Sequence, residues 1–577
     1  MMPKRLKTAV SLAALAIPCI TPAYATAPNS SSNGRIDHVL LLSIDGMHAV
    51  DFLNCTHGIV GINDGKPYCP NLTTLSQTGV NYVGTISSRP SDSFPGLAAL
   101  VTGGSPKTTG LYYDVAYDRS LAPPASSTGT GLAGGTCTPY AAPPGTTTDF
   151  DQGTEYDDTK LNGGAPAPYS VTDGGIQSID PNHLVRDPAT GCQPVFPWDF
   201  VRTNTIFSVA HSAGLYTAWI DKHASYAFTA GPGGHGLDDY YSPEVDSTVI
   251  PLPGVSTALG ASCSPIRDQS PIGESAWAAS FENIQCYDAL KVKALLREIA
   301  GKTHTGGAAQ IPALFGMNFQ SFYIGASVNE TGVAKGGYQN AAGLPSDPLF
   351  KEVQFVDASI GDIVTALKNA GIYDSTLLIV TAKHGGSPID PNLYVANGTN
   401  TPATLLATAG YIPASESPLT AGGIGATEDD VSVLWLKPGS DIKKAVELLE
   451  TPKNLAETGL GQLYYGPSLA LNYNQGGLGP GLDPRSPDII VTPNVGMTYS
   501  GSTTMIADHG GFAHDDTNVV MLVSNPSFTA QTVATPVTTM QVAPTIVKAL
   551  GLDPKALDAV RAEGTQVLPE VAAQLPQ

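Results

Sequence analysis

The most constraining feature of the sequence is an apolar run, residues 38–44, that ends at Asp45-Gly46. It reads His-Val-Leu-Leu-Leu-Ser-Ile, and such a continuous run is typical of a parallel strand buried on both faces. Ligands of open α/β sheets bind beyond the carboxyl ends of the strands, so the run places Asp45 where a functional carboxylate would lie. A turn aspartate is the alternative, because Asp-Gly is a common turn pair.

Buried strands and amphipathic helices alternate along most of the chain. Residues 348–370 carry an apolar stripe at helical spacing, Gly371 closes this helix, and 377–381 follows as another buried strand. This order predicts an α/β fold, an α/β/α sandwich around a mainly parallel sheet with loop-rich cap insertions. Further strands are expected at 82–87, 216–220, 312–319, 431–436, 488–491 and 518–524, and helices at 205–214, 286–300, 442–449 and 539–550.

The first 25 residues have the pattern of a secretory signal peptide. Lys4 and Arg5 precede an apolar stretch, and residues 23–25 form a suitable cleavage site. The stretch is short and contains Pro18, which argues against a membrane anchor. We therefore expect export to the periplasm or the extracellular space, with no membrane anchor in the mature protein.

Composition divides the remaining chain into one α/β domain with insertions. A polar linker at 26–35 precedes the α/β pattern, which extends over 36–555, and 556–577 is expected to be a C-terminal tail. Residues 119–200 and 240–285 are rich in Gly, Pro and Thr and have no helical period. We expect these two segments to be loop-rich insertions.

Six cysteines remain after removal of the predicted signal peptide. An even number in an exported protein indicates up to three disulfides, with several connectivities open. No CxxC spacing is present, so cysteine-bound zinc is not expected. Short separations favour Cys55–Cys69 and Cys263–Cys286, and Cys137 with Cys192 would tie the first insertion.

The formal net charge of −21 limits the possible partners. A protein this acidic repels phosphate backbones unless a metal or local basic groups reverse the field. General nucleic-acid binding is therefore not expected, whereas a small anionic substrate remains possible at a local site. Nothing in the sequence indicates an oligomeric state.

Residues 91–100 turn from a strand-like run into an apolar helix. A hydroxyl at such a turn lies among free backbone N–H groups at the positive end of the helix dipole, which is an anion site. Ser93 is therefore a candidate nucleophile. The alternative is that Ser91, Asp92 and Ser93 only cap the helix.

Two further glycine-flanked sites are His384-Gly385 and Asp508-His509-Gly510. A parallel sheet would bring both to the edge that carries Asp45 and Ser93. Carboxylate, imidazole and hydroxyl groups suit a Zn²⁺-like or Mn²⁺-like ion, although any single histidine could be an ordinary loop residue. We interpret the other polar residues near these sites as loop, supporting or reserve positions: Lys222, His223, His235, His514, Asp515 and Asp516.

These motifs resemble the alkaline phosphatase superfamily, and most of all its type I phosphodiesterase/nucleotide pyrophosphatase branch. The similarity is carried by residues 41–47, by 89–103 with Ser93, and by 356–361 through His384-Gly385. It is collinear over most of the chain. The resemblance implies an α/β/α sandwich, a two-metal site and phosphoester hydrolysis through a phosphoryl-enzyme intermediate.

The resemblance also assigns roles to residues, and the sequence departs from some of them. Ser93 matches the nucleophile, and the metal ligands match Asp45, His384 and His509. Lys383 stands in place of a metal-binding aspartate, and a protonated ammonium group cannot ligate a cation. The expected Asp-x-x-x-His pair is missing from 316–322.

Asp114 stands where a phosphate-binding asparagine is expected, and its carboxylate would repel phosphate. One arrangement that accommodates these departures is a single metal ion, with Lys383 replacing the second positive charge. A lysine beside a metal has a lowered pKa, so that Lys383 could also act as a base or as the acid for the leaving group. The ligands of this ion would be Asp45, Ser93, His384, Asp508 and His509.

Together these observations predict an exported, metal-dependent hydrolase of small phosphoesters, with diesters favoured over monoesters. One or two divalent ions are expected, zinc first and Mn²⁺ or Mg²⁺ as alternatives. A related hydrolase of phosphonate or sulfate esters is the second enzymatic hypothesis. A secreted, non-catalytic pseudoenzyme that binds an anion is the alternative from another class.

Overall fold

The computed structural model describes residues 35–127, 132–149, 179–245, 254–263, 277–418, 425–502 and 504–575. The predicted signal peptide, nearly all of the predicted linker and parts of both predicted insertions lie outside these ranges. Among the described helices, none is both long enough and apolar enough to cross a membrane.

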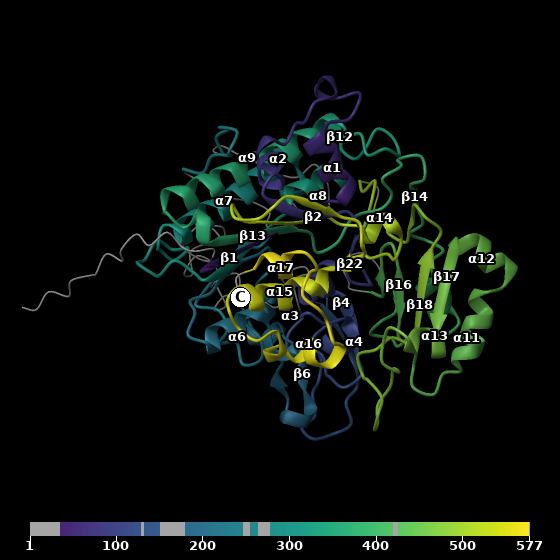
Figure 1. Cartoon of the computed structure of the whole chain (residues 1–577). Helices are drawn as coiled ribbons and strands as arrows, with labels where there is room; N and C mark the ends of the chain where they lie inside the picture. The colour runs from purple at the N-terminus through teal and green to yellow at the C-terminus, as the bar shows by residue number, and fades with distance from the viewer. Residues whose placement is uncertain are drawn as a thin grey trace, which may run out of the picture. The chain divides into compact units, whose positions relative to one another are not determined.

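A central eight-stranded sheet positions the candidate site (Figure 1). Its strands follow in the order β21 (Gln531–Val533), β2 (Gly79–Tyr82), β20 (Met521–Ser524), β13 (Thr376–Thr381), β1 (His38–Ile44), β10 (Leu314–Phe319), β8 (Ala218–Ile220) and β9 (Asp239–Tyr241).

Strand β1 lies in the middle of this sheet and is parallel to both of its neighbours. Leu41 lies opposite Gly316 of β10 and Ile379 of β13. Strand β20 runs antiparallel to β13 and to β2. The predicted mainly parallel sheet is confirmed, with β20 as an antiparallel member that the sequence pattern did not indicate.

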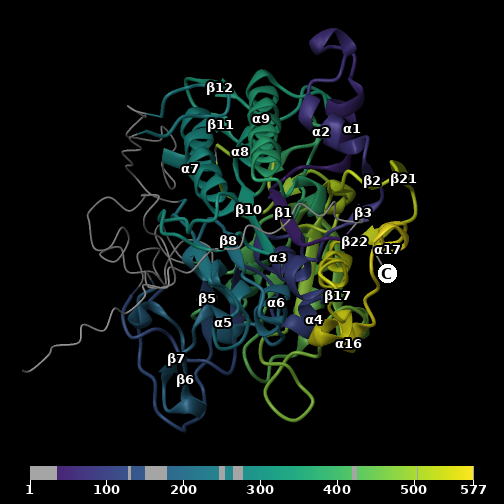
Figure 2. The same ribbon diagram turned by 60° about the vertical axis from the view of Figure 1, so that its left-hand side comes forward.

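Helices cover both faces of the sheet (Figures 1 and 2), as predicted for an α/β/α sandwich. Leu40 and Leu42 pack into one helical layer, and Val39 and Leu41 into the other, because successive side chains of a strand point to opposite faces. This explains why the run is apolar throughout. The first layer holds α1 (Ala49–His57), α2 (Pro70–Ser76), α7 (Phe281–Ile299), α8 (Ser321–Ser327) and α9 (Asp347–Asn369), and the second holds α3 (Ser93–Thr102), α6 (Ile206–Ser212) and α15 (Val542–Ala549).

Helix α9 shows how local sequence sets an element. The hydroxyl of Ser346 caps its start by accepting a hydrogen bond from the backbone N–H of Leu349, and the helix ends just before Gly371, whose φ is +72°. The stripe that includes Val353, Ile360 and Leu367 is buried against the sheet, as expected. The single strand expected at 82–87 is wrong in position. Strand β2 ends at Tyr82, and only the short β3 (Thr85–Ile86) lies within the expected range.

Four further strands form a separate, smaller sheet. The predicted strands at 431–436 and 488–491 belong to it, and they pair antiparallel. The apolar run of a strand indicates that the strand is buried, but it does not indicate which sheet the strand joins. The sheet contains β15 (Thr427–Glu428), β16 (Ser432–Leu434), β18 (Ile489–Pro493) and β17 (Leu460–Tyr465), and α10 (Pro402–Thr408), α11 (Ile442–Leu449) and α12 (Pro452–Thr458) lie in the same part of the chain.

The C-terminal segment is packed rather than a free tail. It forms α16 (Asp558–Glu563) and α17 (Val571–Gln574). Val560, Leu568 and Val571 are buried in the core that also contains α3. These three apolar residues are widely spaced in the sequence and form no helical stripe, so the sequence pattern did not indicate that the segment is packed.

Three disulfides are present in the described chain: Cys55–Cys69, Cys137–Cys192 and Cys263–Cys286. The two pairs favoured by short separation are confirmed, and so is the link across the first insertion. Shorter elements include α4 (Pro106–Thr109), β4 (Val115–Asp118), β5 (Thr146–Asp149), α5 (Pro197–Phe200) and α14 (His514–Thr517).

Candidate active site

Ser93 is the first residue of α3, and its side chain does not cap the helix. Asp92 is the cap, since its Oδ2 accepts a hydrogen bond from the backbone N–H of Phe94 at 2.8 Å. The hydroxyl of Ser93 lies 3.0 Å from Nε2 of His384 and accepts a hydrogen bond from Nζ of Lys222 at 3.1 Å. The capping alternative therefore applies to Asp92.

The hydrogen bonds of His384 define its tautomer. Its Nδ1 lies 2.8 Å from the carbonyl oxygen of Gly385. A carbonyl only accepts, so Nδ1 carries the proton and Nε2 of the neutral ring is an acceptor. The hydroxyl of Ser93 can therefore donate to Nε2, which is the geometry of a nucleophile beside its base.

Asp45 ends β1 and is fully buried beside this pair. Its Oδ2 accepts hydrogen bonds from the side-chain amides of Asn318 at 3.1 Å and Gln320 at 2.5 Å. Nε2 of His384 lies 3.7 Å from the same oxygen. The carboxylate is thus held by two amide groups at the end of β10, the neighbouring strand.

Two ammonium groups also face Asp45. Nζ of Lys222 lies 3.9 Å and Nζ of Lys383 lies 4.0 Å from its Oδ2. Burial raises the pKa of Asp45, but Lys383, the His384 ring whenever it is protonated, and Lys222 together outweigh burial and hold the pKa well below its usual range. Asp45 is therefore an ionised carboxylate at neutral pH.

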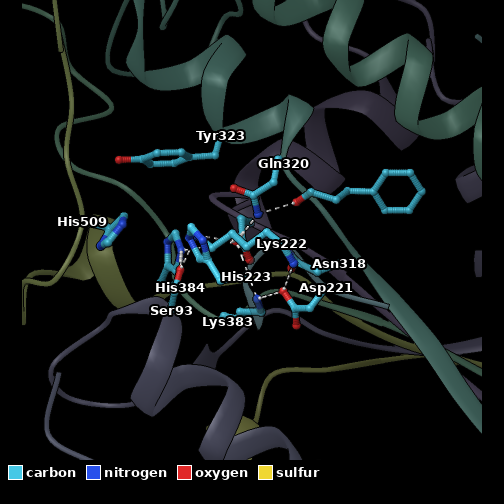
Figure 3. A network of polar contacts seen from close by, with 12 residues as sticks. Ser93, Asp221, Lys222, His223, Asn318, Gln320, Tyr323, Lys383, His384 and His509 are labelled. Atoms are coloured by element: carbon cyan, nitrogen blue, oxygen red, sulfur yellow. Dashed lines mark hydrogen bonds and ion pairs between the residues drawn. The ribbon is translucent and has the colours of Figure 1, made fainter. Parts of the chain in front are cut away.

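Lys383 is itself paired, as Figure 3 shows. It follows β13, is fully buried, and donates a hydrogen bond to Oδ1 of Asp221 at 2.9 Å. Oδ2 of Asp221 accepts from the indole N–H of Trp219 at 2.8 Å, which fixes the carboxylate. The ring of Tyr226 lies under Nζ of Lys383, 4.4 Å from it to the ring centre.

The residues around Asp45 do not fit the divalent metal that the resemblance implies. Within the described ranges, no group of three or more His, Cys, Asp or Glu side chains could hold an ion. Oδ1 of Asp45 has no hydrogen-bond partner among the described residues, but one free carboxylate oxygen is not an ion site. The neighbours at Oδ2 are two ammonium groups, which cannot ligate a cation, and two side-chain amides, which direct their N–H groups rather than their oxygens at Asp45.

His509 and Asp508 precede β20 and reach the same sheet edge because that strand runs antiparallel. The ring centres of His509 and His384 are 4.1 Å apart, and Nδ1 of His509 lies 3.7 Å from Oδ1 of Asp92. Oδ1 of Asp508 accepts from the hydroxyl of Tyr323 at 3.3 Å. In Figure 3, Tyr323 and His509 lie on one side of His384, away from the lysines.

Three buried carboxyl groups, Asp430, Asp508 and Asp516, form a second polar region beside His509. Burial, together with repulsion from Asp516 and Asp508, raises the pKa of Asp430 well above its usual range. Burial raises the pKa of Asp516 to about 7. Asp516 also accepts backbone N–H bonds from Gly511 and Ala513. Asp516 is therefore a buried residue whose side chain points inward, and not a solvated loop residue.

A cavity of about 300 Å³ adjoins this second region. Asp430, Asp516, Ser387 and Phe512 are among the residues that line it, whereas Ser93 is not. Ser93 and His384 are almost fully buried, and the partly exposed neighbours of His384 are Tyr323 and His509. Access to the nucleophile therefore leads past these two rings.

Three residues contact the central residues of the site although the sequence pattern gave them no role there. Lys222 was expected to be a supporting loop residue, yet its ammonium group contacts Ser93. Asn318 and Gln320 lie in residues 316–322, where the expected Asp-x-x-x-His pair is missing, and their side chains donate to Asp45. Their positions at strand ends were the available indication, but it did not distinguish them from ordinary loop residues.

The other candidates are held by other partners or are exposed. His223 contacts Glu244 at 2.7 Å, and His235 is exposed. Oδ1 of Asp114 accepts from the backbone N–H of Val115. The side chain of His514 is 81% exposed, and Oδ2 of Asp515 accepts from the backbone N–H of Ile389. These contacts are those of supporting and surface residues.

Comparison with known proteins agrees with the fold. Murine ectonucleotide pyrophosphatase/phosphodiesterase 5 shares 14% identity with a TM-score of 0.50, over 90% of this chain and 96% of the other. An inactive variant of that protein in complex with AMP gives the same values. The human counterpart shares 12% identity with a TM-score of 0.49, over 89% of this chain and 95% of the other. No curated protein matches the sequence.

The family model described as type I phosphodiesterase/nucleotide pyrophosphatase matches residues 39–140 and 323–512. These segments contain Asp45, Ser93 and His384, whereas Lys222 lies between them. Members of the family are typically dependent on divalent metal ions. The chain belongs to the type I phosphodiesterase/nucleotide pyrophosphatase family, a family of phosphoric ester hydrolases.

Proposed function

We propose that the protein is an exported hydrolase of small phosphodiesters in which Oγ of Ser93 is the nucleophile. The observation that carries this proposal is the position of Oγ, held between Nε2 of His384 and Nζ of Lys222 at the start of α3. Family membership supplies the reaction class. The signal-like first 25 residues and the three disulfides support export.

In the first half-reaction, Ser93 attacks phosphorus. The Oγ–H bond breaks and its proton passes to Nε2 of His384, while the Oγ–P bond forms and the bond from phosphorus to the leaving oxygen breaks. The leaving oxygen takes a proton from solvent. Asp45, 3.7 Å from Nε2, stabilises the imidazolium, and Lys222 stabilises negative charge as it develops at Oγ.

In the second half-reaction, water releases the covalent intermediate. The water oxygen bonds to phosphorus and its surplus proton goes to solvent, which balances the proton taken up earlier. The Oγ–P bond breaks, and Oγ recovers its proton from Nε2 of His384. The products are an alcohol and a phosphomonoester, and the enzyme returns to its starting state.

Replacement of Ser93 tests this proposal. With bis(para-nitrophenyl) phosphate as substrate, Ser93→Ala should reduce kcat/KM by about 10³-fold or more. Ser91→Ala is the matched control, because Ser91 binds the carbonyl of Asp516 rather than His384, and it should remain active. Mass spectrometry of a quenched reaction should find the phosphoryl adduct on Ser93.

Two results would contradict the proposal. One is a Ser93→Ala variant with undiminished turnover. The other is a wild-type protein that hydrolyses para-nitrophenyl sulfate but no phosphodiester, which would favour the sulfate-ester hypothesis.

A further inference from the structure

Among the residues that the structure describes, the charges around Asp45 balance without a metal ion. Lys222 and Lys383 bring two ammonium groups, and Asp45 and Asp221 bring two carboxylates. All four are buried, with Lys222 the least so. Unbalanced charge is costly in a buried site, so a divalent ion added to this balanced set would be unfavourable.

We propose that Lys222 and Lys383 replace the metal ions of the family, and that hydrolysis at Ser93 proceeds without a bound metal. The proposal rests on the proposed function of Ser93. It explains why the positions that would ligate a metal are occupied by hydrogen-bond donors: Lys383, Asn318 and Gln320 all direct N–H groups toward acidic oxygens.

The two lysines have different roles. Nζ of Lys222 contacts Oγ of Ser93 directly, so it also lies where oxygens of a phosphoryl group bonded to Oγ would come. It is a catalytic residue. Nζ of Lys383 contacts Asp221 and approaches Asp45, and among the described residues its contacts do not include Ser93, so it is a positioning residue.

The surroundings hold both ammonium groups in place. The ring of Tyr226 lies 4.4 Å from Nζ of Lys383 and 5.9 Å from Nζ of Lys222. A π face attracts cations, so the Tyr226 ring helps to hold the two ammonium groups in position. A divalent ion would have to displace at least one ammonium group from the ring and from its carboxylate.

The test uses the mature wild-type protein, dialysed against EDTA and phenanthroline, with metal content measured by mass spectrometry. We expect fewer than about 0.1 ions per chain and a change in phosphodiesterase activity of less than about twofold. Adding Zn²⁺, Mn²⁺ or Mg²⁺ should move the Tm by less than about 1 °C. The Tm measurement decides metal binding even if no substrate is turned over.

Loss of more than about tenfold activity on chelation, restored by one of these metals, would overturn the proposal. So would an ion that co-purifies at one per chain and whose removal lowers the Tm. Failure of Ser93 as the nucleophile is a separate result, because it appears only in the Ser93→Ala variant.

Lys222→Met provides a second test in metal-free buffer. It should lower kcat by about 10²–10³-fold without rescue by added metal, and Lys222→Arg should recover part of that loss. Lys335→Met, at an exposed position on the hairpin Asn329–Lys335, is the matched control and should be unaffected. An active Lys222→Met variant, within about twofold of wild type, would contradict a catalytic role for Lys222.

Discussion

Two buried polar regions adjoin the Ser93–His384 pair, and the pKa of a buried aspartate shifts in opposite directions in them. In the lysine region, Asp45 faces Lys222 and Lys383, and its pKa is held well below the usual range. In the carboxyl region, Asp430 faces other carboxyl groups, and burial and repulsion raise its pKa well above that range. Both aspartates are buried, so the nearby cations decide which form is populated.

The opposite pKa shifts imply different roles for the two regions. The lysine region is an ionised network that fixes Ser93 and His384 and can stabilise added negative charge. The carboxyl region holds neutral acids at the approach to His509. A negatively charged substrate would therefore meet the ammonium group of Lys222 at Ser93 and would not be repelled by a fully ionised carboxyl region.

The largest expected effect is on the lysine region. Asp221→Ala removes the partner of Lys383 and leaves a buried ammonium group uncompensated, so the free energy of unfolding should fall by about 3–5 kcal/mol. Urea denaturation measures this change. Glu447→Ala is the control, because it breaks an exposed i,i+4 pair with Lys443 and should cost less than about 0.5 kcal/mol.

A double variant sharpens this prediction. Asp221→Ala with Lys383→Met removes both charges, so it should be more stable than Asp221→Ala alone. Equal or lower stability of the double variant would show that the cost does not come from an unpaired Lys383.

The carboxyl region gives the next effect, through pH. The pKa of Asp516 rises from 3.8 to about 7 in the folded chain, so the folded state holds a proton that the unfolded state has released. Its stabilising contribution is therefore present at low pH and is lost as pH rises through about 7. The raised pKa of Asp430 acts in the same direction.

Asp430→Asn replaces one of these acids by a neutral amide, which should reduce the loss of stability between pH 5 and pH 8 by about 1–2 kcal/mol. Thermal unfolding at the two pH values measures this. Asp374→Asn, at an exposed position, is the control. An unchanged pH dependence in Asp430→Asn would mean that this carboxyl is ionised in the folded protein. Asp45 acts oppositely, since its lowered pKa makes stability fall only as pH drops into the acid range.

The sequence predicted those parts of this arrangement that depend on local pattern. The apolar runs gave β1 and β13, so Asp45 and His384 were correctly placed at the ends of strands. The role of Lys222 depends on β8 lying two strands from β1 in the sheet, and a buried run reports burial but not strand order. The approach of His509 depends on the antiparallel direction of β20, which the run also does not reveal.

The smallest expected effect tests the link between the carboxyl region and the nucleophile. Tyr323 donates a long hydrogen bond of 3.3 Å to Asp508, and its ring centre lies 5.6 Å from that of His384. Tyr323→Phe keeps the ring and removes only the hydroxyl, so stability should fall by about 0.5–1 kcal/mol, with kcat within about threefold of wild type. Tyr323→Ala also removes the ring beside His384 and should lower kcat further. If both variants lower kcat equally, the hydroxyl rather than the ring positions His384, and the two regions are coupled through Asp508.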